Sequence, residues 1–149
     1  MSTLGNVLSK IRPAGNRKRY RAQGKAAVKL ATGSTSNACA ATASQPLVEL
    51  HIIPHIIIGA QSLADTLENQ GWVREHNRGA VQPGWLIVCE DANHNKRSDH
   101  VWFALSNVRR DGKALCFDNQ GVQGISQPYW RNLGTGARTP MWYALRPKD

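Results

Sequence analysis

Two residues with the chemistry of a nucleophile and a base lie about sixty residues apart in this chain. Cys39 stands between the polar run "STSN" and small residues that favour a helix, and His100 opens the strand-like run "HVWFALSNV". A cysteine at a helix N-terminus gains from the macrodipole and from free backbone N–H groups, which favour negatively charged sulfur. Together, a thiolate and an imidazole can cleave an amide by nucleophilic catalysis. Cys39 as a small buried helix residue is the alternative.

A third group would have to orient the imidazole. Asp118 and Asn119 end the strand-like run "KALCFDN", which the turn around Asp111 and Gly112 joins to the preceding strand as a hairpin. Successive strand residues point to opposite faces, so at most one of the two faces His100. We favour Asp118 because a carboxylate also stabilises imidazolium, and Asn119 stays the rival.

The remaining cysteines and the polar loop predict neither a disulfide framework, a metal site nor a bound cofactor. Cys89 and Cys116 lie inside strand-like runs, where a free cysteine usually serves as small apolar packing. Asp91, Asn93 and Asn95 have the spacing of a calcium loop, but the glycine and the glutamate that such a loop needs at its sixth and twelfth positions are missing.

Charge is concentrated near the N-terminus. The formal net charge is +9, and the chain up to Val48 holds eight basic residues and no acidic one. We therefore divide the chain into a basic N-terminal arm, residues 1–33, and a domain over residues 34–149. The arm is expected to bind a polyanion such as nucleic acid, anionic lipid or a cell-wall polymer. No apolar run approaches the roughly 20 residues of a membrane span, and no secretory signal is visible.

The order of elements indicates an α+β fold. Helices are expected near residues 3–11 and 25–33, in the small residues that follow the possible caps of "STSN" up to a kink or restart at Pro46, and over residues 59–72. Strands are expected at residues 84–90, 100–108 and 113–119, and in a final strand "MWYALRP". Helices followed by hairpin-connected strands predict N-terminal helices packed on a small antiparallel sheet.

The order of a cysteine, a "PGW" turn leading into a strand, and an Asp-His-Val strand resembles the CHAP type of papain-like cysteine amidohydrolases. The likeness covers roughly residues 34–120, and Trp85 stands where that family usually has aspartate. It implies a papain-like fold, with Cys39 as nucleophile, His100 as base and Asp118 or Asn119 as the orienting group.

The resemblance implies cleavage of peptidoglycan amide bonds, as an endopeptidase or amidase of the kind found in a phage lysin or a virion-associated lysin. Asn37 would help to hold the oxyanion, and Trp85 and Trp102 would line the substrate groove. Localisation would then be virion-associated, or cytoplasmic with non-classical release to the cell wall. The alternative is a non-enzymatic polyanion-binding or virion structural protein with a hydrolase-like fold, whose basic arm contacts nucleic acid or a virion partner.

Overall fold

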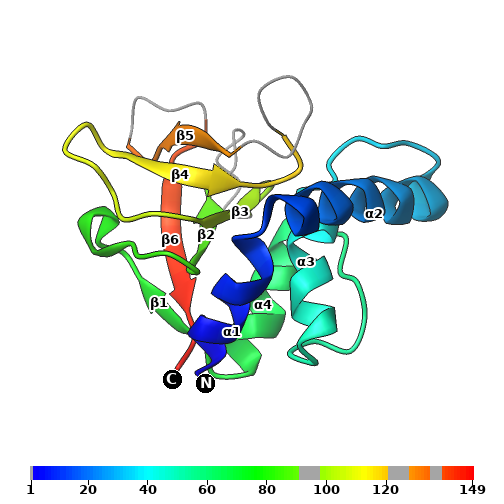
Figure 1. Cartoon of the computed structure of the whole chain (residues 1–149), viewed down its shortest axis with the longest axis horizontal. Coiled ribbons are helices and arrows are strands. Elements are labelled where there is room, and N and C mark those ends of the chain that lie inside the picture. Colours follow the sequence, from blue (N-terminus) through cyan, green and yellow to red (C-terminus); the bar gives the residue numbers. More distant parts are fainter. Residues whose placement is uncertain (1, 91–97, 121–127, 135–138) are drawn as a thin grey trace.

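The computed structural model describes residues 2–90, 98–120, 128–134 and 139–149. Within these ranges the chain is α+β, with four α-helices and one six-stranded antiparallel sheet in the order β1-β6-β2-β3-β4-β5 (Figure 1). The helices are α1 (Thr3–Ile11), α2 (Ala14–Thr32), α3 (Cys39–Glu49) and α4 (Ala60–Asn69), with a short 3-10 helix η1 (Arg78–Ala80). The strands are β1 (Val73–Glu75), β2 (Leu86–Cys89), β3 (Val101–Ala104), β4 (Lys113–Phe117), β5 (Tyr129–Asn132) and β6 (Met141–Arg146).

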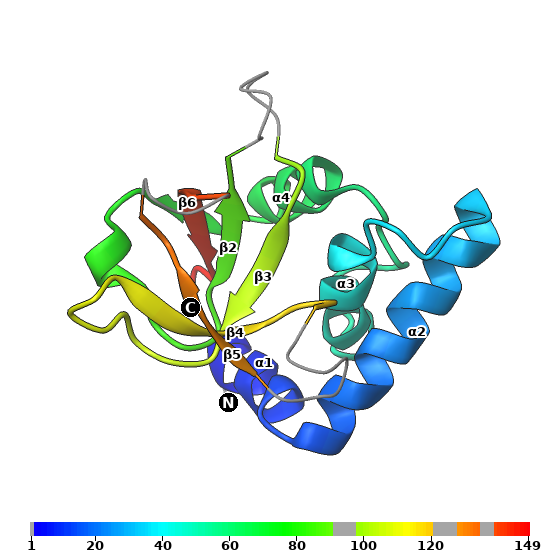
Figure 2. The same ribbon diagram turned by 90° about the horizontal axis from the view of Figure 1, so that it is seen from above.

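The sheet separates two apolar clusters, and β3 contributes to both. Val101 and Phe103 belong to the larger cluster, which the helices share, whereas Trp102 and Ala104 belong to a second cluster on the opposite face. All four residues are buried, as expected for a central strand covered on both sides. Figures 1 and 2 show the four helices gathered on one side of the sheet.

The two N-terminal helices are part of the same core as the rest of the chain. Val7 and Ile11 of α1 and Tyr20 of α2 are fully buried in the larger cluster, and the Tyr20 hydroxyl donates to Glu49 at the end of α3. The basic residues of this segment lie mostly on the outer faces of the helices. Packing therefore does not divide the chain at residue 33, where the basic arm was expected to end.

Helices α2 and α3 approach each other very closely at Gly24. A Cβ atom built on Gly24 would lie 2.3 Å from the Thr42 Oγ1 and 2.8 Å from the Thr42 backbone nitrogen. Only a residue without a side chain allows this contact. Since Cys39 begins α3, the packing at Gly24 also helps to fix the position of the cysteine.

Several boundaries differ from those that the sequence predicts. Strands β1 and β5 were not predicted, because each is short, lies at an edge of the sheet and lacks the apolar alternation of a half-buried strand. The predicted helix ending at Gly33 is much longer and begins at Ala14. Helix α3 continues through Pro46 to Glu49, since the apolar surface that it buries outweighs one missing backbone hydrogen bond. None of the described helices combines the length and apolarity of a membrane span.

Replacing Gly24 with alanine should destabilise the protein by about 1–3 kcal/mol, because the added methyl group must push α2 away from Thr42. Gly15 in the same helix is the matched control, since nothing lies within 4 Å of a Cβ placed there. Gly15→Ala should leave stability unchanged or raise it by up to about 1 kcal/mol. Denaturant unfolding of both variants measures the difference, and equal stabilities would show that the close approach is not required.

Candidate active site

Cys39 is the first residue of α3, as the sequence predicts. The residue before the helix cap, Asn37, has a positive φ of 60°, and it turns the chain into the helix. The first backbone bond of the helix runs from the Thr42 N–H to the Ala38 carbonyl, at 2.9 Å. The amides of residues 39 to 41 precede it, so they have no acceptor within the helix. Cys39 therefore belongs to the positive end of the helix dipole.

The imidazole of His100 is held by the sheet. His100 immediately precedes β3, and its carbonyl oxygen accepts from the Cys89 N–H at 3.0 Å, which continues the β2–β3 ladder. The Ser98 hydroxyl donates to the same carbonyl at 3.0 Å. The ring Nε2 lies 2.9 Å from the Asp118 Oδ2. The backbone of His100 is thus fixed by two hydrogen bonds and its ring by a third.

Asp118 is the residue that faces His100, and its side chain has no exposed surface. It directly follows β4, where its Oδ1 accepts from the Gln120 N–H at 2.8 Å. Its backbone carbonyl accepts from the Nε of Arg21 on α2, at 2.8 Å. Asn119, the rival, makes no contact of this kind: its buried Oδ1 has no hydrogen-bond partner among the described residues.

The Cys39 thiol is the second group that acts on the protonation of the His100 ring. Burial lowers the pKa of His100, but hydrogen bonds with Asp118 and Cys39 outweigh burial and raise this pKa from the usual 6.5 to about 9. Since Asp118 occupies Nε2, Nδ1 is the ring nitrogen that remains for the sulfur. The Cys39 Sγ also lies 3.7 Å from the Asp99 carbonyl oxygen. The order is therefore sulfur, imidazole, carboxylate.

Both reactive side chains are largely covered. Cys39 is 3% exposed and His100 is 8% exposed. The alanines around Cys39 do not leave the sulfur open to a bulky substrate, because they pack into the core together with it. An approaching reagent has to reach a sulfur that helix and sheet enclose.

Three residues that the sequence suggested for substrate binding lie elsewhere or make no contact with the pair. Asn37 is exposed, and its part in the site is the turn before α3. Trp102 is buried in the second cluster, on the face of β3 opposite to the helices. Trp85 lies across from Ala104, at the far end of β3 from His100.

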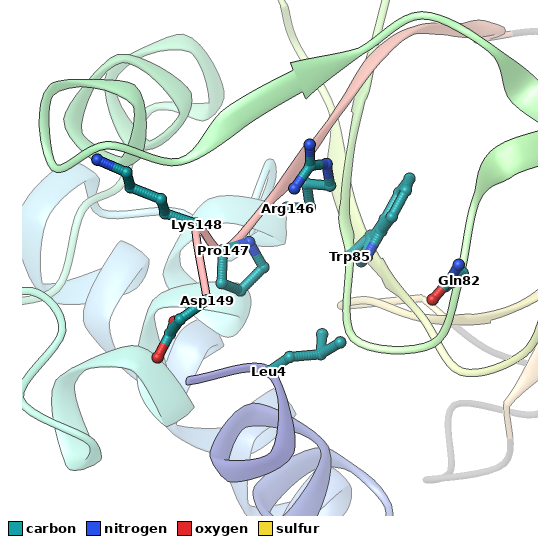
Figure 3. A pocket seen from close by; sticks show the side chains of 7 residues that line it. All are labelled: Leu4, Gln82, Trp85, Arg146, Pro147, Lys148 and Asp149. Carbon is teal, nitrogen blue, oxygen red and sulfur yellow. The ribbon is translucent and has the colours of Figure 1, made fainter. Parts of the chain in front are cut away.

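Trp85 instead contributes to a pocket of about 360 Å³ between the start of α1 and the last residues of the chain (Figure 3). The Arg146 guanidinium and the Trp85 indole lie in it, with Leu4 on the side of α1. The pocket contains neither a cysteine nor a histidine. It is lined by Leu4, Gln82, Trp85, Arg146, Pro147, Lys148 and Asp149.

The sequence did not predict the residues from β5 and α2 that contact Asp118. The Tyr129 hydroxyl donates to the Asp118 Oδ2 at 2.7 Å, and the Arg131 Nη1 lies 3.6 Å from the same oxygen. Both side chains come from β5, a strand that the sequence did not reveal, and Arg21 comes from the segment expected to be a basic arm. The one signal available was the i, i+2 spacing of Tyr129 and Arg131, which places them on one face of a strand.

The described residues include no group of three or more His, Cys, Asp or Glu side chains that could hold a metal ion. The loop with calcium-like spacing, residues 91–97, lies outside the described residues. Comparison with known protein families and with curated protein sequences gives no match, so the chemistry rests on the residues of this chain.

Iodoacetamide should alkylate Cys39 well before Cys89 and Cys116. Burial raises the pKa of Cys89 from 9.0 to about 11, so near neutral pH it forms about 100-fold less thiolate than a cysteine with the usual pKa. Burial also raises the pKa of Cys116. Mass spectrometry of tryptic peptides over time measures the three rates. In His100→Gln the rate at Cys39 should fall on the order of tenfold, because the adjacent positive charge is lost.

The same experiment reports whether solvent reaches the sulfur. Labelling of Cys39 at the rate of the other two cysteines would mean that it is an inert core residue. A rate that is unaffected by His100→Gln would mean that imidazole and sulfur do not act together.

Proposed function

We propose that this protein is a papain-like cysteine hydrolase that cleaves amide bonds. The observation that carries the proposal is the order Cys39, His100, Asp118, in which three separate elements bring a helix-tip sulfur, an imidazole and a buried carboxylate together. A nucleophile, a base and a group that orients the base are the parts that covalent amide hydrolysis needs. Hairpin pairing of β3 and β4 brings the last two within 2.9 Å.

The first half-reaction would form a thioester. The Cys39 thiolate attacks the carbonyl carbon of the substrate, and the carbonyl π electrons move onto oxygen. Collapse of the tetrahedral intermediate expels the amine, which takes a proton from the His100 imidazolium. A pKa of about 9 keeps His100 protonated near neutral pH, so this proton is available. The enzyme now carries the acyl group on sulfur, and His100 is neutral.

The second half-reaction would restore the free enzyme. Neutral His100 takes a proton from water, and the resulting hydroxide adds to the thioester carbonyl. Collapse of this intermediate releases the carboxylic acid and the Cys39 thiolate, and His100 is again imidazolium. Throughout the cycle Asp118 holds the Nε2 side of the ring, so Nδ1 stays directed at the reacting atoms.

The backbone amides at the start of α3 would hold the oxyanion in both intermediates. They precede the first intrahelical bond, that of Thr42, so their N–H groups are available as donors. These amides lie next to the nucleophile in the chain, since one of them belongs to Cys39 itself. Removing one donor of an oxyanion hole typically raises the barrier of acyl transfer by about 2.7–4 kcal/mol. Asn37 would serve mainly through its backbone turn.

The substrate class that we propose is the amide bonds of peptidoglycan, on the basis of the resemblance to CHAP-type amidohydrolases. The positive charge of the N-terminal helices suits an anionic wall polymer. A phage or virion-borne lysin would combine these two properties. The position of the cut, between sugar and peptide or within the stem peptide, distinguishes an amidase from an endopeptidase.

Replacing Cys39 with alanine or serine should abolish the release of muropeptides from purified sacculi, because the sulfur that would form the thioester is lost. Chromatography of the soluble products measures the release. Cys89→Ala is the matched control, since Cys89 is buried like Cys39 but is not the proposed nucleophile. This variant should retain activity in proportion to its folded fraction. Full release by folded Cys39→Ala would refute the hydrolase proposal.

A second candidate function, binding of an anionic polymer without catalysis, is favoured by the outer face of α2. Lys18, Lys25 and Lys29 are exposed there, and their spacing of seven and four residues aligns them along one side of the helix. None of them forms an ion pair with a carboxylate of the described residues. A row of unpaired cations attracts a linear polyanion.

The double variant Lys25→Gln, Lys29→Gln should lose several-fold in affinity for an isolated anionic wall polymer at low salt, because it removes two of the three aligned charges. Co-sedimentation at increasing salt measures the affinity. Arg110→Gln, Lys148→Gln removes the same charge elsewhere and should bind almost normally. If both double variants lose affinity equally, attraction depends on net charge and the lysine row is not a site.

A further inference from the structure

The Asp118 carboxylate carries more partners than the orientation of a histidine requires. Its Oδ2 lies 2.9 Å from the His100 Nε2, 2.7 Å from the Tyr129 hydroxyl and 3.6 Å from the Arg131 Nη1. Its Oδ1 accepts from the Gln120 N–H. In a side chain with no exposed surface, each of these donors competes for the negative charge that His100 needs.

The direction of the hydrogen bonds between these groups is fixed by their chemistry. The Arg131 Nη1 donates to the Tyr129 oxygen at 2.8 Å, and a guanidinium has no acceptor, so the tyrosine proton must be directed at Asp118. Burial is the main cause that raises the pKa of Tyr129, so this hydroxyl stays protonated. The second guanidinium nitrogen of Arg131 donates to the Thr139 hydroxyl. Arg131 is therefore held at both ends.

The strand register places these groups on one side of the sheet. Cys116 of β4 pairs with Tyr129 of β5, and Ala114 pairs with Arg131. Asp118 lies two residues beyond Cys116, so it projects to the same face as its partner strand's tyrosine. The intervening Trp130 points to the other face, where the Arg109 guanidinium stacks on its ring at 3.9 Å. Tyr129 and Arg131 thus form a wall behind the carboxylate.

We propose that Tyr129 and Arg131 are positioning residues of the Cys39–His100 pair: they fix Asp118 in place and take up part of its charge. This inference rests on the proposed hydrolase function. A carboxylate that served His100 alone would hold the imidazolium too firmly for easy return of the proton to a leaving amine. Sharing Oδ2 with a phenol and a guanidinium weakens that hold and keeps the geometry.

The other titratable groups near the site do not share the charge of Asp118 as Tyr129 and Arg131 do. Burial raises the pKa of Cys89 and of Cys116, so both thiols are neutral near neutral pH. Arg21 reaches the backbone carbonyl of Asp118 through its Nε, and its guanidinium lies over the Phe117 ring. Among the described residues, the titratable groups that act on His100 or Asp118 include Arg21 from α2, Cys39 from α3, Cys116 from β4, and Tyr129 and Arg131 from β5.

The test is an NMR titration of the His100 ring in the full-length protein with labelled histidine, assigned with His100→Gln. The wild-type midpoint is expected near pH 9. Tyr129→Phe should raise the His100 midpoint, because Asp118 loses a hydrogen-bond donor and then interacts more strongly with the imidazolium. Arg131→Met should raise it further, on the order of one pH unit, because a full positive charge leaves. Arg131→Lys should bring the midpoint back toward the wild-type value.

The matched controls make the same chemical changes away from Asp118. Tyr143→Phe alters a buried tyrosine of β6, and Arg109→Met removes the arginine on the other face of β5. Both should leave the His100 midpoint unchanged. If Arg131→Met does not fold, as judged by circular dichroism, Tyr129→Phe decides the test by itself. It removes a single oxygen atom and therefore disturbs the packing least. A midpoint that stays constant or falls in Tyr129→Phe overturns the proposal.

The titration separates this inference from the hydrolase proposal. The titration needs no substrate. If the variants shift the His100 midpoint but the wild-type protein releases no muropeptides, the hydrolase proposal is refuted and the positioning role is not. If the wild type is a hydrolase, Tyr129→Phe should lower kcat with little change in KM, since Tyr129 touches no substrate. Active wild-type protein with an unshifted His100 midpoint in every variant would sink the positioning role alone.

Discussion

Burial of the Asp118 carboxylate is the constraint on which the rest of the site depends. A charge with no access to water is tolerated only when protein donors replace the lost solvation. Here the donors come from an imidazole, a phenol, a backbone amide and a guanidinium. Burial alone would raise the pKa of Asp118, and the hydrogen bonds led by that of His100 lower it instead. The carboxylate therefore stays charged, and its charge keeps His100 protonated.

This constraint links parts of the chain that are far apart in sequence. Helix α2 supplies Arg21 to the Asp118 backbone, and its close contact with α3 at Gly24 fixes the helix that begins with Cys39. The sheet supplies His100 from the start of β3 and Tyr129 from β5. The basic N-terminal segment thus has two faces, one packed against the site and one bearing exposed lysines. A single helix therefore carries both the exposed lysines and the contact that positions the proposed nucleophile.

The enclosed sulfur shapes the chemistry that we propose. A thiol covered by helix and sheet is protected from casual oxidation and from bulky reagents, and the same cover strengthens the electrostatic interaction with imidazolium. Under the proposed function, a substrate would have to displace part of that cover to bring its carbonyl to the sulfur. Selectivity for an extended, anionic polymer over free peptides would follow, because remote binding energy can offset the cost of opening.

The residue types of the site and the local elements around it can be predicted from the sequence alone. The polar run before small residues predicted a helix beginning at Cys39, and the Asp-Gly turn predicted the hairpin that brings His100 and Asp118 together, since both depend on neighbours in the chain. The choice between Asp118 and Asn119, the burial of the sulfur, the positions of Trp85 and Trp102 and the packing of α1 and α2 into the core all depend on long-range contacts. Tyr129 and Arg131 belong to this second group as well. Their role arises from the register between β4 and β5, and long-range strand pairing leaves almost no trace in a single sequence.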